Sequence, residues 1–191
     1  MKAMVITGFG GPEVFKKTDL EKPVPGPNEL LVKVYATSVN PVDYKIRKAG
    51  SWAGLELPAV IGYDASGVVE EIGPGVQDFR PGDEVFYTPE IFGKPGTYAE
   101  YHVVDEAIVA RKPSNLTHEE AAGIPLAGGT AWDALMTRGL LMAGETVLIH
   151  GGSGGVGSLA VQIAKAAGAY VYTTCGDYSK DLVRKLGADR A

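Results

Sequence analysis

The sequence predicts an α/β protein whose N-terminal part is rich in β-strands and is followed by a strand–helix–strand (βαβ) unit. Two observations indicate this. Glycine and proline, 26 and 12 of the 191 residues, separate short strand-like runs in residues 1–115. After Asn115 the apolar residues follow the periods of helices and of buried parallel strands. We therefore expect two domains, a β domain over residues 1–115 and an incomplete α/β domain over residues 116–191.

The β domain is predicted from alternating runs. Between Leu30 and Val39, apolar residues at every second position predict a strand with one buried face. Similar runs predict strands over residues 65–72, 84–88 and 98–104. Gly-Pro clusters between the runs indicate turns, so this part is expected to be an irregular β unit.

Helices begin after Asn115. Thr117 and Glu120 have the spacing of a capping box, which predicts a helix that starts after Thr117. A second helix is predicted from about Thr130 to Arg138. Residues 145–149 form an apolar, β-branched run that is typical of a parallel strand buried on both faces.

The next segment completes the βαβ unit. Apolar residues from Val156 to Ala167 recur at helical spacing, and Gly168 ends the predicted helix. Residues 170–174 predict the second strand, and residues 179–186 the following helix. A strand, a helix and a second strand in this order indicate a parallel pair with a crossover helix.

Composition excludes several classes of function. Eighteen basic and 23 acidic residues leave a net charge of −5, which argues against binding to nucleic acid or to an anionic membrane. Cys175 is the only cysteine, so no intramolecular disulfide and no zinc site with several thiolates can form. No apolar run is long enough for a membrane span, and Gly and Pro interrupt the N-terminus before a signal-peptide core. We expect a cytoplasmic protein.

A glycine-rich loop lies between the first strand and the helix of the βαβ unit. Gly152, Gly154 and Gly157 form a G-x-G-x-x-G motif at the start of the helix, where backbone N–H groups can bind a pyrophosphate. We assign Gly152 to the tight turn, Gly154 to the close approach of phosphate, and Gly157 to helix–strand packing. The alternative is a tight turn that binds no ligand. The predicted contacts of the loop also include Ser153, Gly155 and Val156.

The stretch VLIHGGSGGVGSLAVQIAKAAGA resembles the cofactor segment of the medium-chain dehydrogenase/reductase superfamily. Further matching stretches are MKAMVITGFGGPEV, SVNPVDYKIRKAG, PAVIGYDASGVVEEIGPGVQDFRPGDEV, GTYAEYHVV and EEAAGIPLAGGTAWDAL. Within the superfamily the chain is most similar to the zinc-free quinone oxidoreductases and related enone reductases. The resemblance implies a GroES-like β domain, then a Rossmann-type doubly wound dinucleotide-binding domain, with the active site in the cleft between them.

The same resemblance implies that no catalytic zinc is bound. Zinc-dependent members have a cysteine ligand where this chain has Asn40, and a His-Glu pair where it has Tyr63 and Asp64. An amide and a phenol cannot replace a thiolate and an imidazole, so we expect no metal site. Without a Lewis acid, hydride transfer to a quinone or to an α,β-unsaturated carbonyl is favoured over alcohol oxidation.

Three residues are predicted on the substrate side, each with a structural alternative. Lys45 matches a lysine that some enone reductases hold near the substrate oxygen, where it can stabilise developing negative charge; it can also be a solvated surface lysine. Tyr63 can bind a substrate carbonyl, or only fill space. Asn40 is expected in the substrate pocket, as in similar enzymes. Asp43 is expected to pair locally instead.

On the cofactor side, Thr130 matches the position that meets the nicotinamide carboxamide, with a helix N-cap as the alternative. Ser179 and Lys180 match positions that contact the adenosine 2′-phosphate in similar NADPH-dependent reductases, and Gly176 is also expected to bind the cofactor. An NAD enzyme has an acidic residue at the strand end where this chain has Cys175. NADPH is therefore the expected cofactor, with NADH as the alternative because of nearby Asp177. His150 is interpreted as a core histidine.

The predicted function is an NADPH-dependent oxidoreductase that acts on a small quinone or enone and forms a homo-oligomer when complete. The alternative is a non-catalytic nucleotide-binding or interaction module. The sequence stops at Ala191, where only the first strands of a six-stranded sheet are present. We therefore expect residues 1–191 alone not to catalyse hydride transfer.

Overall fold

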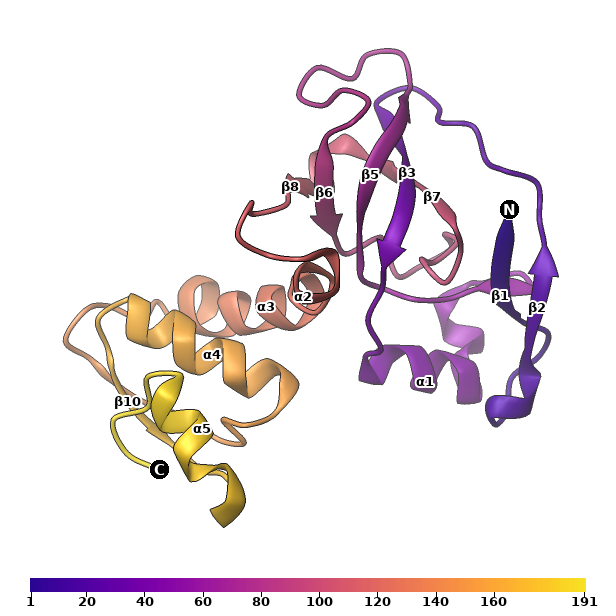
Figure 1. Cartoon of the computed structure of the whole chain (residues 1–191). Helices are drawn as coiled ribbons and strands as arrows, with labels where there is room; N and C mark the ends of the chain where they lie inside the picture. The colour runs from indigo at the N-terminus through magenta and orange to yellow at the C-terminus, as the bar shows by residue number, and fades with distance from the viewer. The chain divides into compact units, whose positions relative to one another are not determined.

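The computed structural model describes all residues 1–191 and divides into two compact units, Met1–Leu126 and Ala127–Ala191 (Figure 1). The division lies after Leu126 rather than after Asn115. The reason is that helix α2 (His118–Ala122) packs against strands of the first unit, with the imidazole Nδ1 of His118 2.8 Å from the hydroxyl of Ser66. Each unit is described by itself.

The first unit contains two antiparallel sheets. Its strands are β1 (Lys2–Ile6), β2 (Phe15–Asp19), β3 (Glu29–Ala36), β4 (Ala59–Val60), β5 (Ala65–Ile72), β6 (Glu84–Tyr87), β7 (Tyr101–Asp105) and β8 (Val109–Arg111). The larger sheet has the order β7-β3-β5-β6-β8, and the smaller has the order β2-β1-β4. Helix α1 (Pro41–Ala49) follows β3, and short 3₁₀ turns lie at Pro12–Val14, Gly50–Ala53 and Glu106–Ile108. The predicted irregular β unit is confirmed.

Three apolar clusters stabilise this unit, the smallest of them formed by Ala3, Val5 and Val60. One covers a face of the larger sheet and includes Leu30, Val69 and Val85. Another joins α1 to the smaller sheet through Ile6, Ile46, Ile61 and Tyr63. The strand predicted from Leu30 to Val39 ends at Ala36, and its first half is buried on both faces, since Leu31 is fully buried as well.

The second unit contains the predicted βαβ arrangement. Strands β9 (Thr146–Ile149) and β10 (Tyr170–Thr173) pair in parallel, and helix α4 (Gly155–Ala166) connects them. Val161, Ala164 and Val171 form the centre of its core. A 3₁₀ turn (Asp177–Ser179) and helix α5 (Lys180–Lys185) follow.

The helix predicted from Thr130 begins earlier. Helix α3 spans Pro125–Trp132 and continues into a π-helical segment, Asp133–Arg138. Proline is favoured in the first turn of a helix because an N–H group at that position has no intrahelical acceptor, so nothing is lost when proline lacks it. The proposed N-cap role of Thr130 is therefore wrong, since Thr130 lies inside α3.

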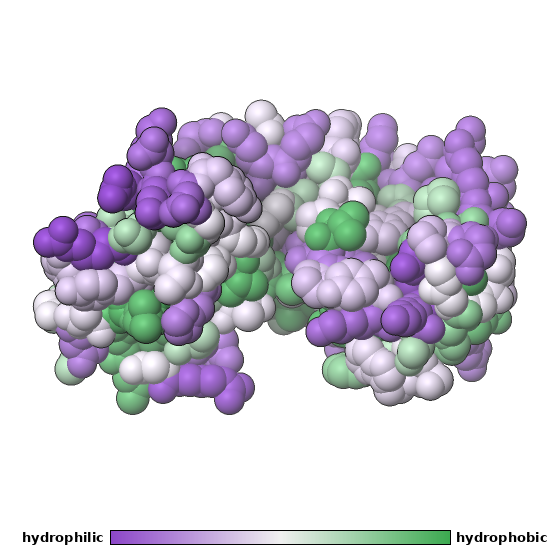
Figure 2. Space-filling model, turned by 90° about the horizontal axis from the view of Figure 1, so that it is seen from below, coloured by the Kyte–Doolittle hydropathy of each residue, from purple (hydrophilic) through white to green (hydrophobic).

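Apolar side chains remain exposed on the two-stranded sheet of the second unit. Leu148 and Tyr172 are 58% and 43% exposed, whereas their neighbours Ile149 and Val171 are buried. Figure 2 shows one face of the molecule, on which green apolar residues lie at the surface among purple polar ones. The sheet is therefore covered by helices on one face only. No helix combines the length and apolar character of a membrane span.

Candidate functional site

Asn40 is held rigidly at the start of α1. It is the N-cap residue of the helix, and its backbone N–H donates to the carboxylate of Asp43, while the Asp43 N–H donates to the Asn40 carbonyl at 3.0 Å. The side-chain Nδ2 donates to Ser38 Oγ at 2.9 Å and to Asp64 Oδ2 at 2.7 Å. Both amide protons therefore have acceptors, and the carbonyl oxygen of the amide is left for other contacts.

Asp64 organises the region around Asn40. Its carboxylate is fully buried and also accepts hydrogen bonds from the Ser38 hydroxyl and, at 2.8 Å, from the Leu126 N–H. Burial raises the pKa of Asp64, and the hydrogen bonds from Ser38, Asn40 and Leu126 oppose that rise. This carboxylate thus links the segment before α1 to the start of α3.

A second buried pair lies beside this network. Burial raises the pKa of Asp43 to about 6, and burial followed by the charge of Asp43 raises the pKa of Tyr63 to about 12. Asp43 Oδ1 and the Tyr63 hydroxyl are buried and have no hydrogen-bond partner. Tyr63 is therefore a neutral phenol with an unused donor. The local pairing predicted for Asp43 is confirmed by its bond to the Asn40 N–H.

Lys45 lies on α1 with an exposed side chain and makes no hydrogen bond or ion pair. No hydrogen bond connects it to Asn40 or Tyr63. All three predicted substrate-side residues therefore lie in the first unit. Asn40 and Lys45 belong to α1 and its N-cap, and Tyr63 lies between β4 and β5. Only Asn40 is part of the Asp64 network.

The glycine loop of the second unit has close backbone packing at two positions. A Cβ at Gly157 would lie 2.1 Å from the Gly151 carbonyl oxygen, and a Cβ at Gly152 would lie 2.1 Å from Thr173 Oγ1. The positive φ of the turn belongs to Gly151, at +70°. Gly157 allows close packing as predicted, but the helix packs there on the loop at Gly151 and Gly152 and not on a strand. The tight-turn role assigned to Gly152 is wrong, because Gly151 has it and Gly152 packs on β10.

The same loop leaves room on its outer side. A Cβ at Gly155 would meet nothing within 4 Å, and Gly154, Gly155 and Val156 are all exposed. Gly154 is the N-cap of α4, so the first N–H groups of the helix have no intrahelical acceptor. Such groups at the positive end of a 12-residue helix suit a pyrophosphate. The residues present therefore fit a dinucleotide.

The other predicted cofactor residues lie at separate places in this unit. Thr130 is exposed on α3. Gly176 precedes the 3₁₀ turn after β10 and Ser179 is its last residue, and the Ser179 N–H donates to the Gly176 carbonyl at 2.8 Å. Ser179 is buried, whereas the side chain of Lys180 is 44% exposed and its ammonium pairs with Asp177 at 2.8 Å.

Sequence reasoning missed Asp64 as the organising residue. Its signal was a carboxylate inside the otherwise apolar stretch from Ala59 to Val69. The histidine interpretation also needs correction. His150 is exposed and lies 3.2 Å from Thr174 Oγ1, so it is no core residue. The buried histidine is His102. No group of three or more His, Cys, Asp or Glu side chains is placed to hold a metal ion.

Comparison with known proteins places these features in a family. Residues 26–114 match the alcohol dehydrogenase GroES-like domain. The chain is 42% identical over 209 residues to the human mitochondrial NAD(P)H oxidoreductase RTN4IP1, covering 99% of the chain and 52% of that protein. It is 40% identical over 204 residues to the chloroplastic NADPH-dependent alkenal/one oxidoreductase of Arabidopsis thaliana, covering 100% and 52%. A zinc-type alcohol dehydrogenase-like protein of Staphylococcus aureus is 42% identical, with 97% and 59% covered.

Solved structures agree with this assignment. The quinone oxidoreductase from Coxiella burnetii superposes with a TM-score of 0.90 at 38% identity, over 100% of this chain and 61% of that one. A mycobacterial protein complexed with NADPH superposes with a TM-score of 0.86 at 38% identity, over 100% and 57%. The chain spans about half the length of the curated relatives it matches. With its GroES-like domain and its βαβ glycine loop, the chain belongs to the medium-chain dehydrogenase/reductase superfamily.

Proposed function

We propose that this chain belongs to an NADPH-dependent oxidoreductase that transfers hydride to a quinone or an α,β-unsaturated carbonyl without zinc. The glycine loop is the main observation behind the proposal. On its inner side Gly157 packs closely against Gly151, and on its outer side the first N–H groups of α4 have no intrahelical acceptor. The relatives named NAD(P)H and alkenal/one oxidoreductase support the same class of reaction.

In the proposed site, the N–H groups of Gly155, Val156 and Gly157 bind the pyrophosphate, since the Gly154 N–H already donates to the Gly151 carbonyl at 2.9 Å, and Lys180 binds the 2′-phosphate. Thr130 is proposed to hold the nicotinamide carboxamide. Bound NADPH supplies a hydride. Lys180 is already within 2.8 Å of Asp177, so a phosphate has to compete with that carboxylate for the ammonium. Both side chains are exposed, and salt screens their attraction, so a nearly dianionic phosphate is the stronger partner.

On the acceptor side, the task of the protein is to stabilise negative charge on an oxygen. When hydride reaches the β-carbon of an enone, the electron pair of the C=C bond moves to give an enolate oxygen. The ammonium of Lys45 is free to donate to that oxygen, because it has no partner in the structure. A proton then completes the saturated ketone, or the hydroquinone when the acceptor is a quinone.

Asn40 and Tyr63 have different proposed tasks. Because both protons of the Asn40 amide are bound to Ser38 and Asp64, Asn40 can only accept a hydrogen bond from the substrate or the cofactor. The Tyr63 phenol is a neutral donor with no partner, which suits a carbonyl oxygen. We propose both as binding residues on the substrate side.

Two measurements test the proposal. The first is the NADPH and NADH affinity of the protein before and after Lys180→Glu. We expect NADPH to bind about 10- to 100-fold more tightly, from one charge-assisted hydrogen bond, and the substitution to remove most of that preference. Equal affinities in the unmodified protein would show that the cofactor assignment is wrong.

The second measurement is steady-state NADPH oxidation with 1,4-benzoquinone and a simple enone, in a longer protein that contains this chain. Turnover of either acceptor supports the oxidoreductase. Tight NADPH binding without turnover of any acceptor would favour the non-catalytic module. The cytoplasmic location stays a prediction, since two relatives are named mitochondrial and chloroplastic.

A further inference from the structure

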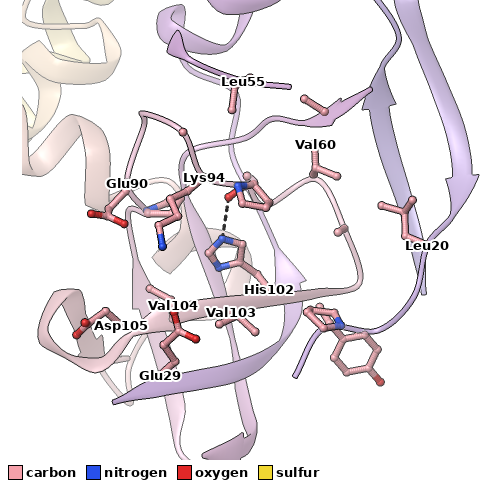
Figure 3. Close-up of a pocket in the computed structure, with 18 of the residues that line it drawn as sticks. Leu20, Glu29, Leu55, Val60, Glu90, Lys94, His102, Val103, Val104 and Asp105 are labelled. Carbon is pink, nitrogen blue, oxygen red and sulfur yellow. Dashed lines mark hydrogen bonds between the residues drawn. The ribbon is translucent and has the colours of Figure 1, made fainter. Parts of the chain in front are cut away.

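The first unit contains a pocket of about 970 Å³ that none of the proposed site residues lines. One wall is strand β7 over its full length, and the other walls include β4 and the loop over residues 89–96. Figure 3 shows Glu90 and Lys94 on the loop side, Glu29 and Asp105 on the strand side, and His102 between them. Its volume lies within the range of ligand pockets in proteins, and one of its walls is a β-strand.

Strand β7 is an edge strand, because it pairs with β3 and with no other strand. Its register with β3 determines which backbone groups face outward. Val34 N–H donates to the Glu100 carbonyl, and Glu106 N–H donates to the Asn28 carbonyl, both at 2.9 Å. These bonded pairs flank β7, and bonded and non-bonded pairs alternate between antiparallel strands. Every second residue of β7 therefore directs its N–H and C=O away from β3.

The outward-facing residues are Tyr101, Val103 and Asp105. The backbone N–H groups of all three residues, and the C=O groups of Tyr101 and Val103, face away from β3 and make no hydrogen bond, whereas the Asp105 C=O belongs to the first turn of the 3₁₀ segment Glu106–Ile108. All three residues line the pocket. An open row of donors and acceptors along a groove is the arrangement that receives an added strand.

The charges of the residues that line the pocket indicate which kind of added strand would fit it. The carboxylates that line it are Glu21, Glu29, Glu56, Glu90 and Asp105. Lys94 and the amino group of Met1 are the cations among the lining residues. His102 adds no charge at neutral pH, because burial lowers its pKa to about 4. Its Nε2 lies 3.1 Å from the Pro95 carbonyl oxygen and its Nδ1 lies 3.1 Å from the Tyr87 hydroxyl.

We propose that this groove binds an extended, lysine- or arginine-bearing polypeptide segment, which adds a strand to the outer edge of β7. The backbone of the segment exchanges hydrogen bonds with Tyr101, Val103 and Asp105. Its basic side chains meet the carboxylates of the rim. The apolar lining from Leu20, Leu55 and Val60 receives the alternate side chains.

A second copy of this chain is a poorer occupant. Two β7 edges brought together would bring the acidic rims of both copies, each with Asp105 on β7 and Glu29 on β3, to one interface. Like charges across paired strands are destabilising. The acidic rim therefore favours a basic partner over self-association.

The test uses the whole chain and the probe peptide acetyl-KVKVKVK-amide. We expect saturable binding that weakens with salt, and slowed hydrogen exchange of the Tyr101, Val103 and Asp105 amides in two-dimensional NMR spectra. A peptide of the same sequence with every internal amide N-methylated, and acetyl-EVEVEVE-amide, are expected not to bind. Equal binding of the N-methylated peptide, or no slowing at these amides, would overturn the proposal.

Variants separate backbone pairing from charge. Val103→Pro removes an outward N–H that β3 does not use, and an edge strand tolerates proline at such a position. We expect about 2- to 10-fold weaker binding than in Val103→Ala, the size of one lost hydrogen bond. Glu56→Gln with Glu90→Gln should reduce both affinity and salt dependence.

Three other results would also contradict strand addition. One is unchanged affinity in both the proline and the glutamine variants. Another is protection of the outward amides before any peptide is added, which would mean that the protein itself occupies the edge. The third is concentration-dependent dimerisation that Val103→Pro abolishes, which would assign the edge to a second copy. If Val103→Pro fails to fold, the N-methylated peptide still decides the question on the unmodified chain.

Discussion

At the scale of residues, the substrate side of the first unit is built around a buried carboxylate. Asp64 accepts hydrogen bonds from Ser38, Asn40 and Leu126, so one side chain holds two separate segments, the one before α1 and the start of α3. A buried carboxylate with several donors costs less free energy than an unpaired one. The network fixes the direction of the Asn40 amide, while Lys45 remains free.

Replacement of Lys45 tests its proposed catalytic task. In a protein active towards an enone, Lys45→Ala is expected to lower turnover by about 100-fold, the effect of losing one group that stabilises transition-state charge. Lys48→Ala is the matched control, because Lys48 is an exposed lysine of the same helix. Unchanged turnover in Lys45→Ala, or an equal loss in both variants, would make Lys45 an ordinary surface residue.

The raised pKa of Asp43 predicts a stability that falls as pH rises. Its pKa is about 6 in the folded state against 3.8 as the ordinary value, so between these values the folded state binds more protons. The free energy of unfolding should decrease by up to about 3 kcal/mol between pH 4 and pH 6 from this group.

Chemical denaturation of the protein and of Asp43→Asn across this pH range measures the effect. The amide keeps an acceptor for the Asn40 N–H but does not titrate, so the variant is expected to lose most of the slope. Asp64, whose pKa is also raised, should leave a smaller slope of the same sign. A variant with the slope of the unmodified protein would contradict the assignment to Asp43.

At the scale of elements, the sequence predicts the helices and strands that have regular apolar periods better than it predicts which residues contact one another. The capping box at Thr117 is confirmed by both of its hydrogen bonds, from Glu120 N–H at 3.2 Å and to Glu120 Oε2 at 2.9 Å. The βαβ unit is confirmed, and its boundaries differ from the predicted ones by at most one residue. The start of α3 was missed, because the helix begins at a proline and has no polar N-cap signal to mark it.

The sequence pattern does not predict which distant segments contact one another. Gly151 and Gly152 are adjacent glycines in one motif, and only the structure shows which one has the positive φ and which one packs on Thr173. The burial of His102 and the exposure of His150 likewise depend on which strands pair and on what covers them. Residue spacing alone does not contain this information.

The helix–loop contact in the second unit predicts that two glycine-to-alanine substitutions in α4 have different effects on the free energy of unfolding. Gly157→Ala places a Cβ 2.1 Å from the Gly151 carbonyl oxygen, so the loop must open. We expect a loss of about 1–3 kcal/mol in the free energy of unfolding. Gly155→Ala is the control, since its Cβ meets nothing within 4 Å and alanine favours a helix by up to about 1 kcal/mol. Similar stabilities for the two variants in thermal or urea unfolding would refute this packing.

At the scale of the whole molecule, the two units have separate contributions to the proposed reaction. The GroES-like unit supplies Asn40, Lys45 and Tyr63, and the βαβ unit supplies the nucleotide loop. The family could be predicted from sequence because ordered motifs extend over the whole chain. The strand-edge groove could not, because it depends on the sheet order and on the register of β7 with β3.

The absence of zinc is a prediction for the molecule as a whole. Position 40 presents an amide already bound to Asp64, and position 63 presents a buried phenol. Neither is a zinc ligand, so purified protein is expected to contain far less than one zinc per chain. Elemental analysis after brief chelator treatment measures this. About one retained zinc per chain would contradict the zinc-free reaction, and the zinc-type name of one relative makes the measurement worthwhile.

The most direct test of the nucleotide site is an NMR titration of the ¹⁵N-labelled chain with NADPH. The proposed function predicts saturable shifts of the backbone amides from Gly152 to Gly157, together with those around Lys180. It also predicts that Gly157→Ala weakens binding by about 10-fold or more, since the loop that binds the pyrophosphate must open. Saturable shifts confined to other residues, or no shifts at millimolar NADPH, would contradict the proposed oxidoreductase.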